Sequence, residues 1–146
     1  MYRDLKLTYS KEVKKAAGRK ALRFSIDDST LANSKNNPEN DVFYSYKYDG
    51  TLNITAISNN SPIFLSRLYL HKVGQGAQDQ VTILDDVGMP VNFNENTDDF
   101  FMDLESVTGG SVKVNFDIQT NIYLENSPFF ETGSNRLLPM FVVRAD

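Results

Sequence analysis

The sequence predicts an all-β protein, an antiparallel β-sandwich or jelly-roll-like domain of about ten strands. Several separate segments alternate apolar and polar residues, and a strand presents successive side chains to opposite faces. Turns rich in Gly, Asn and Pro separate these segments at short intervals, which is typical of sandwiches. The 146 residues, 40% of them hydrophobic, are enough for a single domain with one core.

The stretch from Ser111 to Leu124 has the clearest alternation and determines the fold class. Its apolar side chains share one parity: Val112, Val114, Phe116, Ile118, Ile122 and Leu124. Its polar side chains share the other: Lys113, Asn115, Asp117, Gln119 and Asn121. We expect the apolar set to face the core and the polar set to face water. A strand of this length must bend or break, and Thr120, which interrupts the apolar set, is the predicted position.

The first 23 residues form a basic N-terminal arm of the predicted domain 1–146. They contain eight Lys and Arg against two acidic residues, a net charge of +6, whereas the acidic body 24–146 carries −10. Such asymmetry favours an arm that binds an acidic partner. The predicted partner-binding side chains are Lys6, Lys11, Lys14, Lys15, Arg19, Lys20 and Arg23.

Within this arm the pattern predicts strand, helix and strand in turn. Residues 5–9 and 22–26 alternate apolar and polar side chains. Between them, Ser10 to Ala17 is the one short helix that the sequence supports, with Ser10 as its N-cap. Gly18 ends this helix and provides a hinge, so we expect the arm to leave its own domain and lie on a neighbouring subunit.

The segments 42–48 and 51–57 form a predicted hairpin, after a polar surface loop. Two registers are open around Asp49-Gly50. A two-residue turn would leave Tyr44, Tyr46 and Tyr48 exposed, where their rings could stack on a sugar. A three-residue loop with Gly50 in the left-handed region would place the same tyrosines in the core, and we favour it because it collects the apolar residues on one face.

A second hairpin is predicted across Thr108-Gly109-Gly110. Its favoured register pairs Leu104 with Val114 and Met102 with Phe116. The stretch 63–73 is apolar enough to be covered on both faces. Shorter strands are predicted at 81–84, 89–93 and 136–144. Whether Asn60-Ser61-Pro62 and Asn126-Ser127-Pro128 mark an internal duplication or ordinary turns is left open.

The residue types needed for catalysis or metal binding are scarce. The chain has no cysteine and one histidine, His71, and it lacks a nucleophile elbow and a glycine-rich phosphate loop. Asn94, Asn96 and Asp98 have part of a calcium-loop spacing, but Asp99 stands where the sharp turn needs glycine. We therefore predict that the protein is not an enzyme and has no catalytic residue, metal or cofactor.

These features together favour a structural or assembly protein. The first hypothesis is a virus or phage particle component (a decoration, connector or tail protein) that is located in the virion and assembled in the host cytoplasm. It would form a homo-oligomer or bind other structural proteins, with nucleic acid contacted through the arm alone and no membrane. The alternative is a carbohydrate-binding β-sandwich module, assisted by calcium. The first segment lacks the apolar run of a signal peptide.

Overall fold

A computed structural model describes residues 4–15, 18–41, 48–74, 76–125 and 135–145. These residues confirm a mainly antiparallel β protein with very little helix. The strands are β1 (Leu7–Lys14), β2 (Lys20–Ile26), β3 (Thr51–Asn53), β4 (Ile63–Ser66), β5 (Phe101–Glu105), β6 (Ser111–Leu124) and β7 (Arg136–Ala145). The described helices are short: α1 (Asp28–Leu31), α2 (Ala77–Gln80), and the 3-10 turns η2 (Pro38–Asn40), η3 (Thr55–Ile57) and η4 (Leu68–Leu70).

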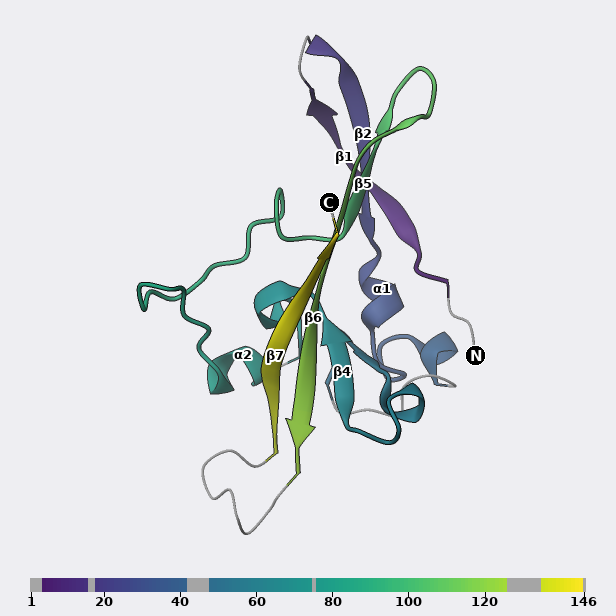
Figure 1. The fold of residues 1–146 in the computed structure, drawn as a ribbon. Helices are drawn as coiled ribbons and strands as arrows, with labels where there is room; N and C mark the ends of the chain where they lie inside the picture. Colours follow the sequence, from purple (N-terminus) through teal and green to yellow (C-terminus); the bar gives the residue numbers. More distant parts are fainter. Residues whose placement is uncertain (1–3, 16–17, 42–47, 75, 126–134, 146) are drawn as a thin grey trace.

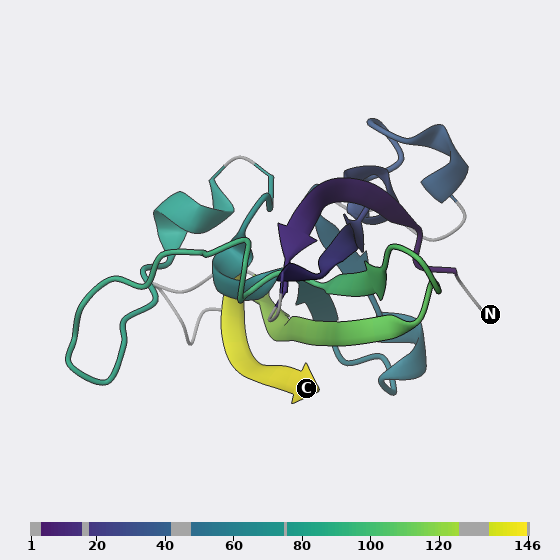
Figure 2. The same cartoon turned by 90° about the horizontal axis from the view of Figure 1, so that it is seen from above.

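The seven described strands belong to one sheet rather than to the two sheets of a ten-stranded sandwich. Their order is β1-β2-β5-β6-β4-β3, and β7 also pairs with β6. The sheet is open and curled, with β1, β2 and β5 at one end of β6 and β4 and β7 at the other (Figures 1 and 2). The long connection before β5 projects away from the sheet in both views. In the described part of the chain, no helix has the length and apolar character needed to cross a membrane.

The N-terminal arm is part of this sheet, which corrects the prediction of a helix at Ser10 to Ala17 over residues 10–15. Residues 16 and 17 lie outside the described residues. Residues 10–14 continue β1, which pairs with β2 in an antiparallel hairpin (Figure 1). An irregularity in the register between Tyr9 and Lys11 absorbs the break in the apolar alternation that suggested a helix. Because β2 in turn pairs with β5, the predicted boundary between residues 23 and 24 falls inside a strand.

The strand β6 runs unbroken through Thr120, where a bend or break was predicted, but its register with β7 shifts at this residue. Thr120 pairs with Phe141 and Asn121 with Pro139, so β7 has one extra residue at this point. The register with β5 differs from the prediction by two residues, because Met102 pairs with Val114 rather than Phe116. The Glu105 carboxylate accepts hydrogen bonds from the turn that follows it, and an irregularity next to Leu104 shifts the strand.

The two faces of β6 are buried in the opposite sense to the prediction. Lys113 of the polar set is exposed, but the other four are buried: Asn115, Asp117, Gln119 and Asn121. On the apolar face, Val112 and Val114 are exposed, and the four apolar residues that follow them are half-buried. The alternation correctly separated two faces of a strand, but the more deeply buried face is the polar one.

Hydrogen bonds explain how the polar face of β6 is buried. Asn121, which is 0% exposed, donates to the Phe64 carbonyl at 3.2 Å and to Ser66 Oγ at 3.0 Å, and it accepts from Gln119 Nε2 at 2.7 Å. The Gln119 side-chain oxygen accepts from the backbone N–H of Tyr69 at 2.9 Å. Buried polar groups are stable when they are satisfied in this way.

Gly50 provides the first testable prediction because the structure leaves no room for a side chain there. Its φ of +76° lies in the left-handed region, and a Cβ would overlap the Lys72 backbone carbonyl. Gly109 has a similar φ of +71° but open space around it. We expect Gly109→Ala to lower the free energy of unfolding by about 1 kcal/mol, and Gly50→Ala by at least about 1–2 kcal/mol more. Urea unfolding of the two variants measures the difference, and equal losses would contradict the overlap.

Candidate functional site

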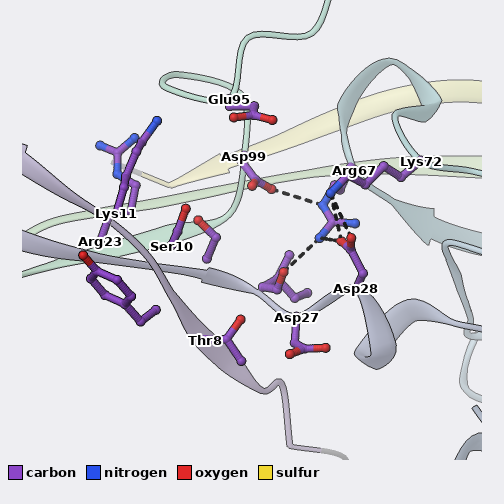
Figure 3. Close-up of a pocket in the computed structure, with 13 residues that line it drawn as sticks. Thr8, Ser10, Lys11, Arg23, Asp27, Asp28, Arg67, Lys72, Glu95 and Asp99 are labelled. Atoms are coloured by element: carbon purple, nitrogen blue, oxygen red, sulfur yellow. Dashed lines mark hydrogen bonds and ion pairs between the residues drawn. The ribbon is translucent and has the colours of Figure 1, made fainter.

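Arg67 is part of the lining of two hollows of different character. It follows β4 directly and begins η4, and its side chain is 5% exposed. Its Nη2 donates to the Ile26 carbonyl at 2.9 Å and lies 2.7 Å from Asp28 Oδ1, and its Nε lies 3.2 Å from Asp99 Oδ1 (Figure 3). These contacts join the end of β2, the start of α1 and the residues before β5.

The first hollow is a polar cleft of about 350 Å³. Its charged lining is balanced, with four cationic and four carboxylate side chains: Lys11, Arg23, Arg67, Lys72, Asp27, Asp28, Glu95 and Asp99. Hydroxyl groups complete it: Thr8, Tyr9, Ser10 and Ser25. The side chains labelled in Figure 3 come from β1, β2, the start of α1, the segment after β4 and the loop before β5. A cleft of this composition can bind a polar or charged group by directed hydrogen bonds.

The second hollow is an apolar groove of about 150 Å³ beside β6. Residues 111–115 of β6 pair with β5 and residues 119–122 pair with β4, so these two strands leave 116–118 between them. The apolar lining consists of Leu5, Ile26, Leu31, Leu52, Leu65, Phe100, Phe116 and Ile118. Ser66, Arg67 and Asp117 provide its few polar groups. Ile26 and Arg67 line both the apolar groove and the polar cleft.

Asp28 is the exposed partner of Arg67, with a side chain that is 60% exposed. It also lies 2.9 Å from Lys72 Nζ. Partial burial acts to raise the pKa of Asp28, but the hydrogen bond from Lys72 and the positive charges of Arg67 and Lys72 outweigh it and leave the pKa below its ordinary value. Asp28 is therefore a carboxylate at neutral pH and balances the Arg67 charge.

A second cluster of charged side chains shares Arg23 with the polar cleft. Asp103 is fully buried, with Arg23 Nε at 2.8 Å from its Oδ1 and Lys15 Nζ at 2.6 Å from its Oδ2. The Arg23 guanidinium also lies over the Phe101 ring, 3.5 Å from the ring centroid. This cluster holds β1, β2 and β5 together at the end of the sheet.

Four of the seven predicted partner-binding residues make side-chain contacts within their own chain. Lys15 and Arg23 pair with Asp103, Lys20 pairs with Glu12, and Lys11 donates to Asn96. The arm is packed as strands β1 and β2 instead of leaving its domain. Of the seven predicted residues, Lys11 and Arg23 line the polar cleft. A partner-binding role of the seven residues stays a prediction.

The alternative hypothesis needs exposed tyrosine rings that can stack on a sugar, and the structure describes one of the three tyrosines. Tyr44 and Tyr46 lie outside the described residues. Tyr48 is buried in the main core cluster, where it packs against Tyr123 and donates a hydrogen bond to the Asn135 carbonyl. Its ring is in the core, as the favoured register predicted for Tyr48, and does not present a face for stacking on a sugar.

Sequence reasoning missed the residues at the centre of the site, Arg67 and Asp28. One signal was available, because Arg67 is the single Lys or Arg in the apolar stretch 63–71. A buried charge in such a stretch needs a partner, but the sequence does not identify which acid provides it. Among the described residues, no group of three or more potential ligands is placed to bind a metal ion. The absence of a cofactor stays a prediction.

Comparison with known proteins identifies the relatives of this chain, which the geometry of the site alone does not. The sequence pattern of the CD36 family matches residues 1–146. Scavenger receptor class B member 1 of Mus musculus is 25% identical over 124 residues, which cover 85% of this chain and 23% of that receptor. The Rattus norvegicus protein of the same name is 24% identical over the same shares. The matched segment is thus under a quarter of the length of these relatives.

These matches correct the functional hypotheses drawn from composition. Similarity to scavenger receptors contradicts a virus or phage particle component and a location in the virion. It also contradicts partners restricted to an assembly and the exclusion of a membrane, and it does not support the sugar-binding alternative. Composition misled because a basic segment followed by an acidic body is equally compatible with ion pairs inside one chain. The match extends over the whole sequence, and the chain therefore belongs to the CD36 family.

Proposed function

We propose that this chain is part of the ligand-binding region of a scavenger-type receptor and that it binds the apolar portion of a ligand in the apolar groove. The observation that carries the proposal is the groove itself, whose walls are apolar side chains from β4, β6 and the segments around α1. The relatives that are named as receptors agree with a binding role. We also propose that this role involves binding without catalysis.

The size of the groove limits what it can hold. A cavity of 150 Å³ lined by Leu, Ile and Phe admits a molecule the size of benzene, or about six carbon atoms. A longer alkyl chain would extend over the half-exposed apolar face of β6, towards Val114 and Val112. Burial of each methylene group contributes about 0.8 kcal/mol, so an alkyl chain of moderate length is a suitable ligand.

The architecture around the groove is a second part of the proposal. We propose that residues 1–146 form one structural unit. The two-sheet sandwich or jelly roll of about ten strands also stays a proposal, and the apolar face of β6 is where a second layer would pack. Such a layer would enclose a ligand between two apolar surfaces, as ligand sites generally do.

We expect 1-decanol, an uncharged probe, to bind the protein in the apolar groove. Isothermal titration calorimetry measures the affinity, and amide chemical shifts identify the site through residues of β4 and β6. Ile118→Asp places a charge on the groove wall, so decanol affinity should fall about tenfold or more. Ile118→Ser, which is less disruptive to folding, should cause a smaller loss in the same direction.

Val87→Asp is the matched control, because Val87 is 80% exposed and does not line the groove. Its decanol affinity should equal that of the unmodified protein within about twofold. Circular dichroism checks that each variant keeps its β structure. If decanol does not bind, or if the two Asp substitutions weaken it equally, the groove is not the ligand site.

A further inference from the structure

We propose that the hairpin tip formed by residues 83–91 is an interaction surface for a protein partner that presents an apolar pocket with a cationic rim. The hairpin tip belongs to the long connection before β5, which projects away from the sheet in Figures 1 and 2. None of its residues lines the apolar groove, so the inference does not depend on the proposed function of that groove.

The first step is the shape of the hairpin tip, which its own hydrogen bonds define. The Val91 backbone N–H donates to the Ile83 carbonyl at 3.0 Å. The Asp85 backbone N–H donates to the Met89 carbonyl at 2.9 Å. The Asp85 carboxylate accepts from the backbone N–H groups of Val87 at 3.0 Å and Met89 at 2.8 Å, which closes the turn. A preformed turn loses little conformational entropy when it binds a partner.

The second step is the attachment of the hairpin tip to the body of the protein. On one side of the tip, Val81 packs against the main core cluster. On the other side, the Phe93 ring stacks on the His71 ring, with 3.8 Å between the ring centroids and 3° between the ring planes. Because both ends of the hairpin are fixed in this way, its tip is held outside the sheet.

The third step is the apolar surface of the hairpin tip. The side chains of Val87, Met89 and Leu84 are 80%, 61% and 54% exposed. Apolar side chains grouped on one part of a surface are typical of interaction sites, because their burial against a partner is favourable. A concave apolar surface on the partner would remove these three side chains from water.

The fourth step is the charge of the connection, which determines the kind of partner. Residues 74–100 contain no Lys or Arg and six carboxylates: Asp79, Asp85, Asp86, Glu95, Asp98 and Asp99. Asp85 and Asp86 directly precede Val87 at the tip. A cationic rim around the partner's apolar pocket complements this charge. A lipid surface fits less well, because anionic headgroups repel carboxylates and an apolar interface desolvates them.

The test uses three short synthetic peptides as probes of the partner's chemistry. The first is an amphipathic helical peptide of Leu and Lys, the second has Glu in place of Lys, and the third has Ser in place of Leu. In isothermal titration calorimetry the first should bind the full chain, and the other two should bind at least about tenfold more weakly. Amide chemical shifts should change in residues 83–91 and not in the parts of β4 and β6 that line the apolar groove.

Val87→Ser removes the most exposed apolar side chain of the tip and should weaken binding of the Leu and Lys peptide about threefold to tenfold. Ile57→Ser is the matched control, because Ile57 is 79% exposed but lies in η3. Its affinity for the peptide should stay within about twofold of the unmodified protein.

Asp86→Asn tests the charge of the hairpin tip. It should weaken binding of the Leu and Lys peptide about threefold and reduce the dependence of that binding on salt. Asp79→Asn makes the same change of charge in α2, outside the tip, and should alter the affinity by less than about twofold. Circular dichroism checks that every variant keeps its β structure.

The other outcomes overturn the proposal. No binding of the Leu and Lys peptide, or equal affinity for the Lys and Glu peptides, rejects a cationic partner. Equal losses in Val87→Ser and Ile57→Ser, or shift changes confined to β4 and β6, reject the hairpin tip as the contact. Binding to phosphatidylcholine vesicles that is lost in Val87→Ser assigns the tip to a membrane, and self-association that is lost in Val87→Ser assigns it to a second copy of the chain.

Discussion

Asp103→Ala should lower the free energy of unfolding by about 3–5 kcal/mol, the largest stability effect expected for this chain. The Asp103 carboxylate is fully buried and accepts hydrogen bonds from Arg23 Nε at 2.8 Å, Arg23 Nη2 at 3.0 Å and Lys15 Nζ at 2.6 Å. Its removal leaves the buried Arg23 charge without its carboxylate partner. Removing one member of a buried pair costs far more than the pair contributes, because the other charge stays desolvated.

The control is Glu12→Ala, which removes an exposed ion pair from the same hairpin. Glu12 lies 3.0 Å from Lys20, and both side chains are well exposed, so the loss should stay below about 1 kcal/mol. Chemical denaturation at neutral pH measures both variants. Similar losses for Asp103→Ala and Glu12→Ala would show that burial does not amplify the Asp103 interaction.

The same carboxylate should produce a specific pH dependence. Burial acts to raise the pKa of Asp103, but the hydrogen bonds and charges of Arg23 and Lys15 outweigh it and hold the pKa below the ordinary value of 3.8. A carboxyl group with a lowered pKa stabilises the fold above its unfolded-state value, and this stability is lost as the pH falls through the folded-state value. The unmodified protein should therefore lose stability below about pH 4 more steeply than Asp103→Asn, in denaturation curves recorded at successive pH values.

The β class and many of the strands follow from the local pattern. Alternation identified β6 to the residue, because it depends on side chains within one strand. The predicted bend or break at Thr120 is instead a shift in the register with β7. The arm was misread for a reason that is equally physical. Lys15 and its partner Asp103 are 88 residues apart, so the sequence shows a surplus of charge where the fold has an ion pair.

The candidate site could not be predicted from the sequence, because its residues are also far apart along the chain. Arg67, Asp28 and Asp99 come from three distant segments, and the gap that forms the apolar groove exists because β4 and β5 pair with separate parts of β6. Periodicity also cannot say which face of a strand is packed. The polar face of β6 is buried because distant groups, such as the Phe64 carbonyl and the Tyr69 N–H, satisfy its side chains.

This inversion of the faces leads to the second large effect. We expect Asn121→Ala to lower the free energy of unfolding by about 2–4 kcal/mol, because Asn121 makes buried hydrogen bonds with Phe64, Ser66 and Gln119, and alanine leaves them unsatisfied. Val114→Ala on the apolar face should cost less than about 1 kcal/mol, since Val114 is already 38% exposed. The conventional expectation for an alternating strand is the reverse. Urea unfolding of both variants decides between these two expectations. A larger loss of unfolding free energy in Val114→Ala than in Asn121→Ala would mean that the apolar face is the packed one in solution.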